Sequence, residues 1–247
     1  MVGGAMRLVH RRIRRACQGR FLRTGTILCL RAFSPPRTPN RQVINMALTI
    51  NQQIVTYVSG NIGTQVGDGE CWTLAEQALA QAGAQTSRDI MGASKVTPDA
   101  DYVWGDKIAA KDITPGDILQ FRDYVMKTRT VVSVLYKNLP QGVTISPNPV
   151  DESDDEETFD QKHHTSIAAK SYDNKRVAVL HQNVPPDGKK IQSGTLAMDS
   201  IDAKSTVTNE TRTLKAGDKN VTLSVTVTTT VTVTVTGTIW AYRPKKK

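Results

Sequence analysis

The chain has 247 residues, of which 38% are hydrophobic and 22% are charged, a composition typical of a soluble globular protein. Its net charge of +9 would favour nucleic acid as a partner, but residues 1–45 alone hold ten Arg and no acidic residue, so the remainder is near −1 (+9 less +10). We therefore exclude nucleic acid as a partner of the body. We also expect no membrane span, because no run reaches the roughly 18 apolar residues that a spanning helix needs.

The Arg-rich leader, residues 1–45, is expected to be poorly ordered and separate from a single domain over residues 46–247. Its acid-free composition resembles that of an organellar transit peptide. Alternatively, the start is over-extended and translation begins at Met46. We favour a cytoplasmic location, with organellar import if the leader is a genuine presequence.

Two helices are predicted next. Residues 50–58 carry apolar side chains at helical spacing, and the Ser59-Gly60 pair ends this helix. A second helix begins near Cys71, and Gly83 is placed to end it. Its apolar face is formed by Leu74, Ala75, Ala78, Leu79 and Ala82. A polar region then extends to about Thr114.

From Pro115-Gly116 onward the signals favour strands. Short strands are expected at residues 117–121, 130–136, 143–145, 164–170 and 176–182. Between them, Asp151 to Asp160 contains seven acidic residues in ten, which predicts a solvated, mobile surface loop.

The C-terminal segment alternates Val or Leu with Thr or Ser from Val221 onward, which predicts a sheet with one buried face. At about 3.3 Å per residue, the segment is too long for one ordinary strand. We therefore expect a bend or hairpin near Thr228 to Thr230, followed by a closing strand from Thr238 to Arg243.

Cys71 is the only cysteine in the body, and a helix N-terminus favours the nucleophilic thiolate. The alternative is a buried structural cysteine. A thiol nucleophile needs an imidazole within reach, and His164 opens a strand directly after a polar segment. His163 is expected to point away from the sulfur, because adjacent strand residues face opposite sides.

A third polar group is needed to orient such an imidazole, and His181 or Asn183 is placed to do so at the end of an apolar strand. Two other interpretations of the histidines stay open. An isolated strand-edge histidine is often structural, and His163 with His164 and residues 151–157 could instead collect a divalent metal.

Four motifs in this order, GDGECWTLAEQALAQAGA, PGDILQF, HHTSIAA and VLHQN, resemble the CHAP and NlpC-type branch of the papain-like cysteine peptidases and amidases. The chain looks closer still to the cysteine-proteinase-fold domain of some fungal actin-patch proteins and of uncharacterised bacterial chains. This resemblance implies an α+β papain-like fold with N-terminal helices packed on an antiparallel sheet. It also implies Cys71 as nucleophile, His164 as base, and His181 and Asn183 as orienting residues.

The resemblance implies a thiol-dependent hydrolase acting on a peptide or amide, without a cofactor or metal. Glu70 departs from the pattern, since a neutral residue is common before the nucleophile and an acid opposes thiolate formation. The rival interpretation is a catalytically weak papain-fold binding or scaffold module, with Tyr102 and the body's tryptophans as surface anchors or core residues. Rapid alkylation of Cys71 near neutral pH would distinguish the two. The oligomeric state is not predicted.

Overall fold

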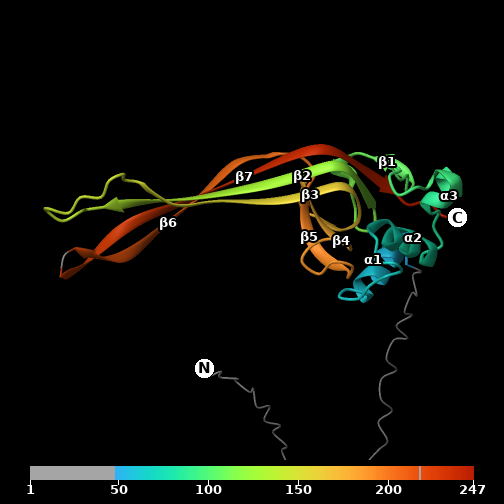
Figure 1. The fold of residues 1–247 in the computed structure, drawn as a ribbon, viewed down its shortest axis with the longest axis horizontal. Coiled ribbons are helices and arrows are strands. Elements are labelled where there is room, and N and C mark those ends of the chain that lie inside the picture. Colours follow the sequence, from blue (N-terminus) through green and yellow to red (C-terminus); the bar gives the residue numbers. More distant parts are fainter. Residues whose placement is uncertain (1–47, 217) are drawn as a thin grey trace, which may run out of the picture. The chain divides into compact units, whose positions relative to one another are not determined.

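The computed structural model describes residues 48–216 and 218–247, and the expectations for the leader fall outside this range. The described chain has few helices and a large antiparallel sheet (Figure 1). The expected α+β fold is therefore confirmed only in part, because the domain is mostly β. Its helices are α1 (Ile50–Gly60), α2 (Cys71–Gln81) and α3 (Ser87–Met91), with 3₁₀ turns at Ala93–Lys95 and Ala110–Asp112. Its strands are β1 (Asp106–Ile108), β2 (Ile118–Lys137), β3 (Val150–Ser171), β4 (Arg176–His181), β5 (Gln192–Ala197), β6 (Ile201–Ala216) and β7 (Lys219–Arg243).

The first two helices form where the sequence predicts them. α1 starts with a capping box between Thr49 and Gln52, which satisfies two otherwise unpaired backbone donors. α2 buries its predicted apolar face, and Gly83, just beyond its end, has a positive φ of 66°. Asn51 of α1 donates a hydrogen bond to the buried Asp117 carboxylate (2.9 Å), which ties this helix to the start of β2.

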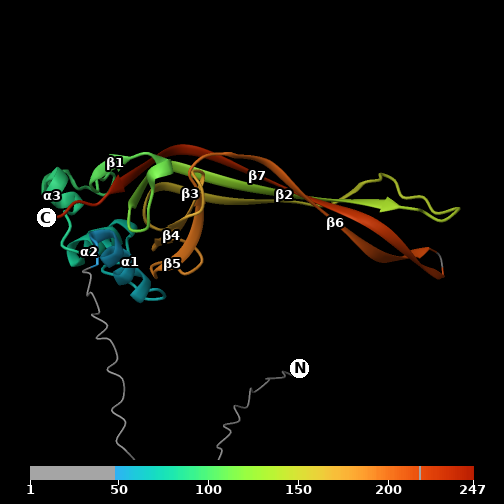
Figure 2. The same ribbon diagram turned by 180° about the vertical axis from the view of Figure 1, so that it is seen from behind.

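The sheet has the strand order β1-β7-β2-β3-β4-β5, and β6 pairs with the same edge of β7 beyond β1. β2, β3, β6 and β7 continue together well beyond the helices, as the two opposite views show (Figures 1 and 2). We call this extension the arm and define it as residues 125–137, 150–162, 201–216 and 219–236. At the helix end, β4 and β5 curl under the same sheet (Figure 2).

Near the helices the sheet is buried on both faces. The face toward α1 and α2 packs Ile118, Ile167 and Leu180 against the helices, with Tyr102 and Trp104. The opposite face forms a second core within the curl of the sheet, where Leu119 and Phe121 are central. Along β2 and along β3, consecutive side chains therefore point alternately into the helix-side core and into the second core.

The acidic segment is a strand, not the predicted loop. Residues 151–160 belong to β3 and pair with β2, where Asp154 forms an ion pair with Arg129 and Glu156 with Lys127. Backbone pairing with β2 and these cross-strand charges hold the segment extended despite its composition.

The long strands also differ from the predictions. Residues 117–121 and 130–136 are parts of one strand, β2, whereas 143–145 is not a strand. β7 has no hairpin at Thr228 to Thr230, because β2 and β6 pair with it on both edges there. The irregularity lies instead at Gly237, where β2 and β7 shift register and the glycine approaches the Asp123 carbonyl too closely for any side chain. β1, β5 and β6 were not among the predicted strands, and β1 lies within the region expected to be polar.

Candidate functional site

Cys71 is the first residue of α2, as predicted, and only 8% of it is exposed. The residue of β3 that contacts it is Thr165. Burial raises the pKa of the Cys71 thiol; the nearby backbone and side chain of Thr165 oppose this rise, and the neighbouring Glu70 carboxylate adds to it. The thiol is therefore protonated at neutral pH.

Thr165 belongs to a buried polar network on the helix side of the sheet. Its hydroxyl donates to Gln120 Oε1 (2.8 Å), which also accepts a hydrogen bond from Trp104 Nε1 (3.1 Å). A second buried amide, Gln182, fixes the segment before Cys71, since its Nε2 donates to the carbonyls of Val66 (3.0 Å) and Glu70 (2.7 Å). The segments on either side of Cys71, in β3 and before α2, are thus fixed by buried hydrogen bonds.

His164 does not face Cys71, and this expectation was wrong. Adjacent strand residues point to opposite faces, so the register that brings Thr165 to the helices turns His164 into the second core. There its ring lies 5.9 Å from Phe121 and 6.2 Å from Phe159, measured between ring centroids. The sheet therefore separates this imidazole from the sulfur.

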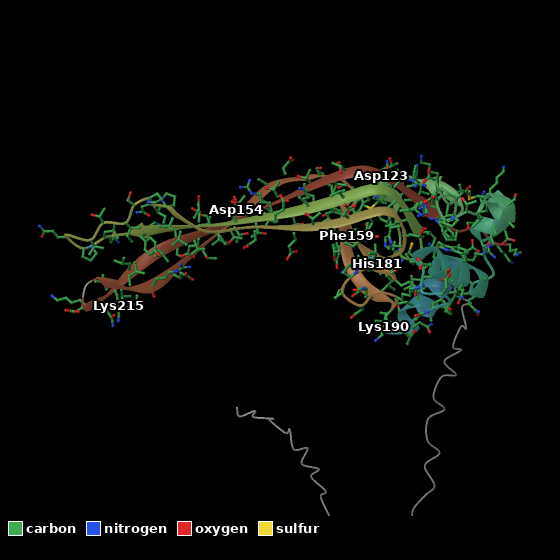
Figure 3. All side chains as sticks on the ribbon, viewed as in Figure 1. Asp123, Asp154, Phe159, His181, Lys190 and Lys215 are labelled. Carbon is green, nitrogen blue, oxygen red and sulfur yellow. The ribbon has the colours of Figure 1, made fainter. Side chains whose placement is uncertain are left out.

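His181 lies beside His164, which is the part of the expected arrangement that is present. His164 Nε2 and His181 Nδ1 are 3.2 Å apart, and His181 also stacks on Phe159 (Figure 3). Burial lowers the pKa of His164 well below its usual value and that of His181 to about 4. Both imidazoles are therefore neutral at pH 7 and are packed among the apolar side chains of the second core.

Asn183 lies apart from this pair. Its side-chain amide donates to Glu70 Oε2 (2.7 Å), so it is not the second orienting group behind the His164 ring. Glu70 is also 3.5 Å from the ammonium of Lys189. Through these contacts, residues 183–189, which follow β4, are held against the residue that precedes α2.

His163 occupies the face that was expected for His164. Its ring centroid is 5.0 Å from that of Tyr102, and its Nε2 is 3.0 Å from Gln120 Nε2. Burial, followed by the nearby Arg122 charge, lowers the pKa of His163, so this ring is neutral as well. The expectation that His163 points away from the cysteine side is therefore wrong, although within residues 48–216 and 218–247 no hydrogen bond joins an imidazole to Cys71.

The aromatic side chains considered as anchors mainly pack the core on the helix side. Tyr102 and Trp104 are buried, and Trp72 and Trp240 are half-buried against the same cluster. Burial, with a smaller contribution from the charge that Cys71 carries once it ionises at high pH, raises the pKa of Tyr102 to about 12. Among the described residues, no three His, Cys, Asp or Glu side chains are grouped to hold a metal ion.

A helix that begins with a buried cysteine and packs on a largely antiparallel sheet is the arrangement that the resemblance to the papain-like cysteine peptidases implies. In agreement, residues 30–144 match the family model described as the AIM3/BBC1 cysteine proteinase-fold domain, which confirms the resemblance to the domain of fungal actin-patch proteins. The match includes Cys71 and ends before the three histidines of the body. No curated protein and no solved structure matches the chain. Within the described part of the chain, none of the helices is long and apolar enough to cross a membrane.

Proposed function

We propose that this chain is a papain-fold binding or scaffold module with little or no thiol-hydrolase turnover. The observation that carries the proposal is that β3 turns Thr165 toward Cys71 and places His164 on the opposite face of the sheet, beside Phe121. A nucleophilic thiol needs a base that accepts its proton, and a threonine hydroxyl does not do so at neutral pH. The chain would retain the fold of the cysteine peptidases while lacking the imidazole where the reaction requires it.

The electrostatics of the cysteine support the same conclusion. Reactive cysteines have a lowered pKa and lie partly exposed in an electropositive environment. Burial and the Glu70 carboxylate instead raise the pKa of Cys71. Its helix N-terminus alone does not reverse this, because the dipole of a helix end stabilises a charge only modestly.

A cysteine hydrolase of peptides or amides is the second candidate, and one observation favours it. His163 lies on the helix side of the sheet and is bonded to Gln120, as a base is bonded to its orienting amide. In that case His163, rather than His164, would be the base.

The test is the rate of iodoacetamide labelling of the full-length protein at pH 7.4. Because the chain also contains Cys17 and Cys29, the modified peptide that contains Cys71 is quantified by mass spectrometry. A protonated thiol on a residue that is only 8% exposed should react at least about tenfold more slowly than the same peptide in urea. A His163→Gln variant should label at the same rate as the wild type. Fast labelling that is lost in His163→Gln would contradict the proposal and support the hydrolase.

A further inference from the structure

β3 presents an open edge along the arm. It pairs with β2 from Val150 to Ile167, whereas β4 pairs with its other edge only from Ile167 to Ser171. In the described ranges, no strand pairs with the outer edge of residues 150–162. The outward N–H and C=O groups of this edge are available to another extended chain, which is the usual basis of strand addition.

The charge of this edge is largely uncompensated. Residues 150–162 contain seven acidic side chains and one Lys. Three of the acids form ion pairs: Asp154 with Arg129, Glu156 with Lys127, and Glu152 with Arg212. Four others form no ion pair with any described residue: Asp151, Asp155, Glu157 and Asp160. Figure 3 places Asp154 midway along the arm, well away from His181.

The acids also lie on both faces of the strand. Asp154 and Asp155 are adjacent, as are Glu156 and Glu157, and adjacent side chains of a strand point to opposite faces. A neighbouring strand would therefore meet negative charge on each of its two faces. Opposite charges in directly facing positions stabilise a strand pair, and like charges destabilise it.

The opposite edge of the arm, formed by β6, is not predominantly acidic. β6 carries Asp202 and Glu210 together with Lys204, Arg212 and Lys215, so it has charges of both signs. A second copy of the acidic edge is also a poor partner, because its carboxylates would repel those of the first. The acidic residues on both faces of residues 150–162 therefore favour pairing with a basic strand over pairing with a second copy of this edge.

We infer that residues 150–162 bind an extended Lys- or Arg-rich segment of another protein, which adds to β3 as a further antiparallel or parallel strand. The inference depends on the proposed function only in that the chain acts by binding. Its test does not depend on Cys71, because the arm extends away from α2, the helix that begins with this residue (Figure 1).

The experiment uses the full-length protein and two fluorescent peptides of 12 residues. The first alternates Lys with Thr and can pair as a strand; the second alternates Lys with Pro and has the same charge but lacks half of the backbone donors. Fluorescence anisotropy at low salt should give a Kd at least about tenfold lower for the Lys-Thr peptide, and binding should weaken as salt screens the charges. Hydrogen exchange in residues 150–162 should slow when this peptide binds.

The matched variants locate the site. Combined Asp151→Asn, Asp155→Asn, Glu157→Gln and Asp160→Asn should weaken binding at least about tenfold, since these acids carry the attraction. Asp202→Asn with Glu210→Gln, on the β6 edge, should leave it unchanged. Circular dichroism and thermal melting check that both variants fold.

Several results would overturn the inference. Equal binding of the two peptides would indicate charge attraction without strand pairing, and unchanged binding by the acidic-edge variant would place the peptide elsewhere. No binding of the Lys-Thr peptide would also exclude it. Self-association in light scattering that the acidic-edge variant abolishes would make a second copy the occupant. If Cys71 labels rapidly while the peptide binds as expected, only the proposed function fails.

Discussion

The helix end of the domain and the arm are built from the same strands but are stabilised differently. Near α2, β3 is enclosed on both faces, and residues 164–168 are all buried. In the arm, residues 154–158 of the same strand are all exposed. The first region is held by packing in two cores, whereas the second is held by backbone pairing and half-buried cross-strand contacts. A strand therefore does not need a buried face along its whole length if its backbone is paired with a neighbouring strand.

The two regions should differ most in how much unfolding free energy is lost when one apolar side chain is truncated in each. Leu74→Ala removes a fully buried side chain from the helix core and should lower the free energy of unfolding by about 2–5 kcal/mol. Val231→Ala, at a half-buried position of β7 in the arm, should lower it by about 1 kcal/mol or less. Urea denaturation measures both. Equal losses would show that the arm is packed as tightly as the core.

Acid should act on the helix end through the His164–His181 pair. The folded-state pKa values of both are lowered, so their contribution is fully present above the unfolded pKa of about 6.5 and is lost as the pH falls toward 4. The lowering for His181 corresponds to at most about 3 kcal/mol. We expect the free energy of unfolding, measured in urea, to fall between pH 7 and pH 4.5 by less in His181→Gln than in the wild type. An identical fall in both would assign the acid sensitivity to other groups.

The smallest effect is expected on the arm surface. Arg129 and Asp154 are 58% and 49% exposed, and such ion pairs contribute about 0–1 kcal/mol. Arg129→Gln should therefore shift the unfolding midpoint only slightly, and 0.5 M salt should reduce the difference further. A loss comparable to that of Leu74→Ala would mean that cross-strand charges, rather than backbone pairing, hold the arm together.

The same contrast explains which parts of the fold could be predicted from the sequence. α1 and α2 show helical spacing and clear end signals, and the turn before Asp117 is marked by Pro115-Gly116, so these elements were placed correctly. The acidic half of β3 was not, because its stability comes from β2 and leaves no local apolar pattern. Composition alone could not distinguish a charged strand from a loop.

Two features of the candidate site were predicted correctly: Cys71 at the start of α2, and the contact between His164 and His181. A strand that is buried on both faces has no alternation of apolar and polar residues, so nothing local indicates which face each side chain takes. His163 and His164 are identical in type, and only the register with β2 assigns one to each core. Gln120 and Thr165 were missed for the same reason, since each lies within an otherwise apolar or mixed strand.

The position of β7 has a consequence for how the domain folds. β7 follows all the other described strands in the chain, yet it lies between β2 and the strands β1 and β6. Its pairing with β2 joins residues about a hundred positions apart, such as Gln120 and Trp240. Non-local pairing of this kind slows folding, because loop closure costs entropy before the contacts form. During synthesis, β2 must wait with one edge unpaired until residues 219–243 have left the ribosome, which exposes the growing chain to incorrect strand pairing.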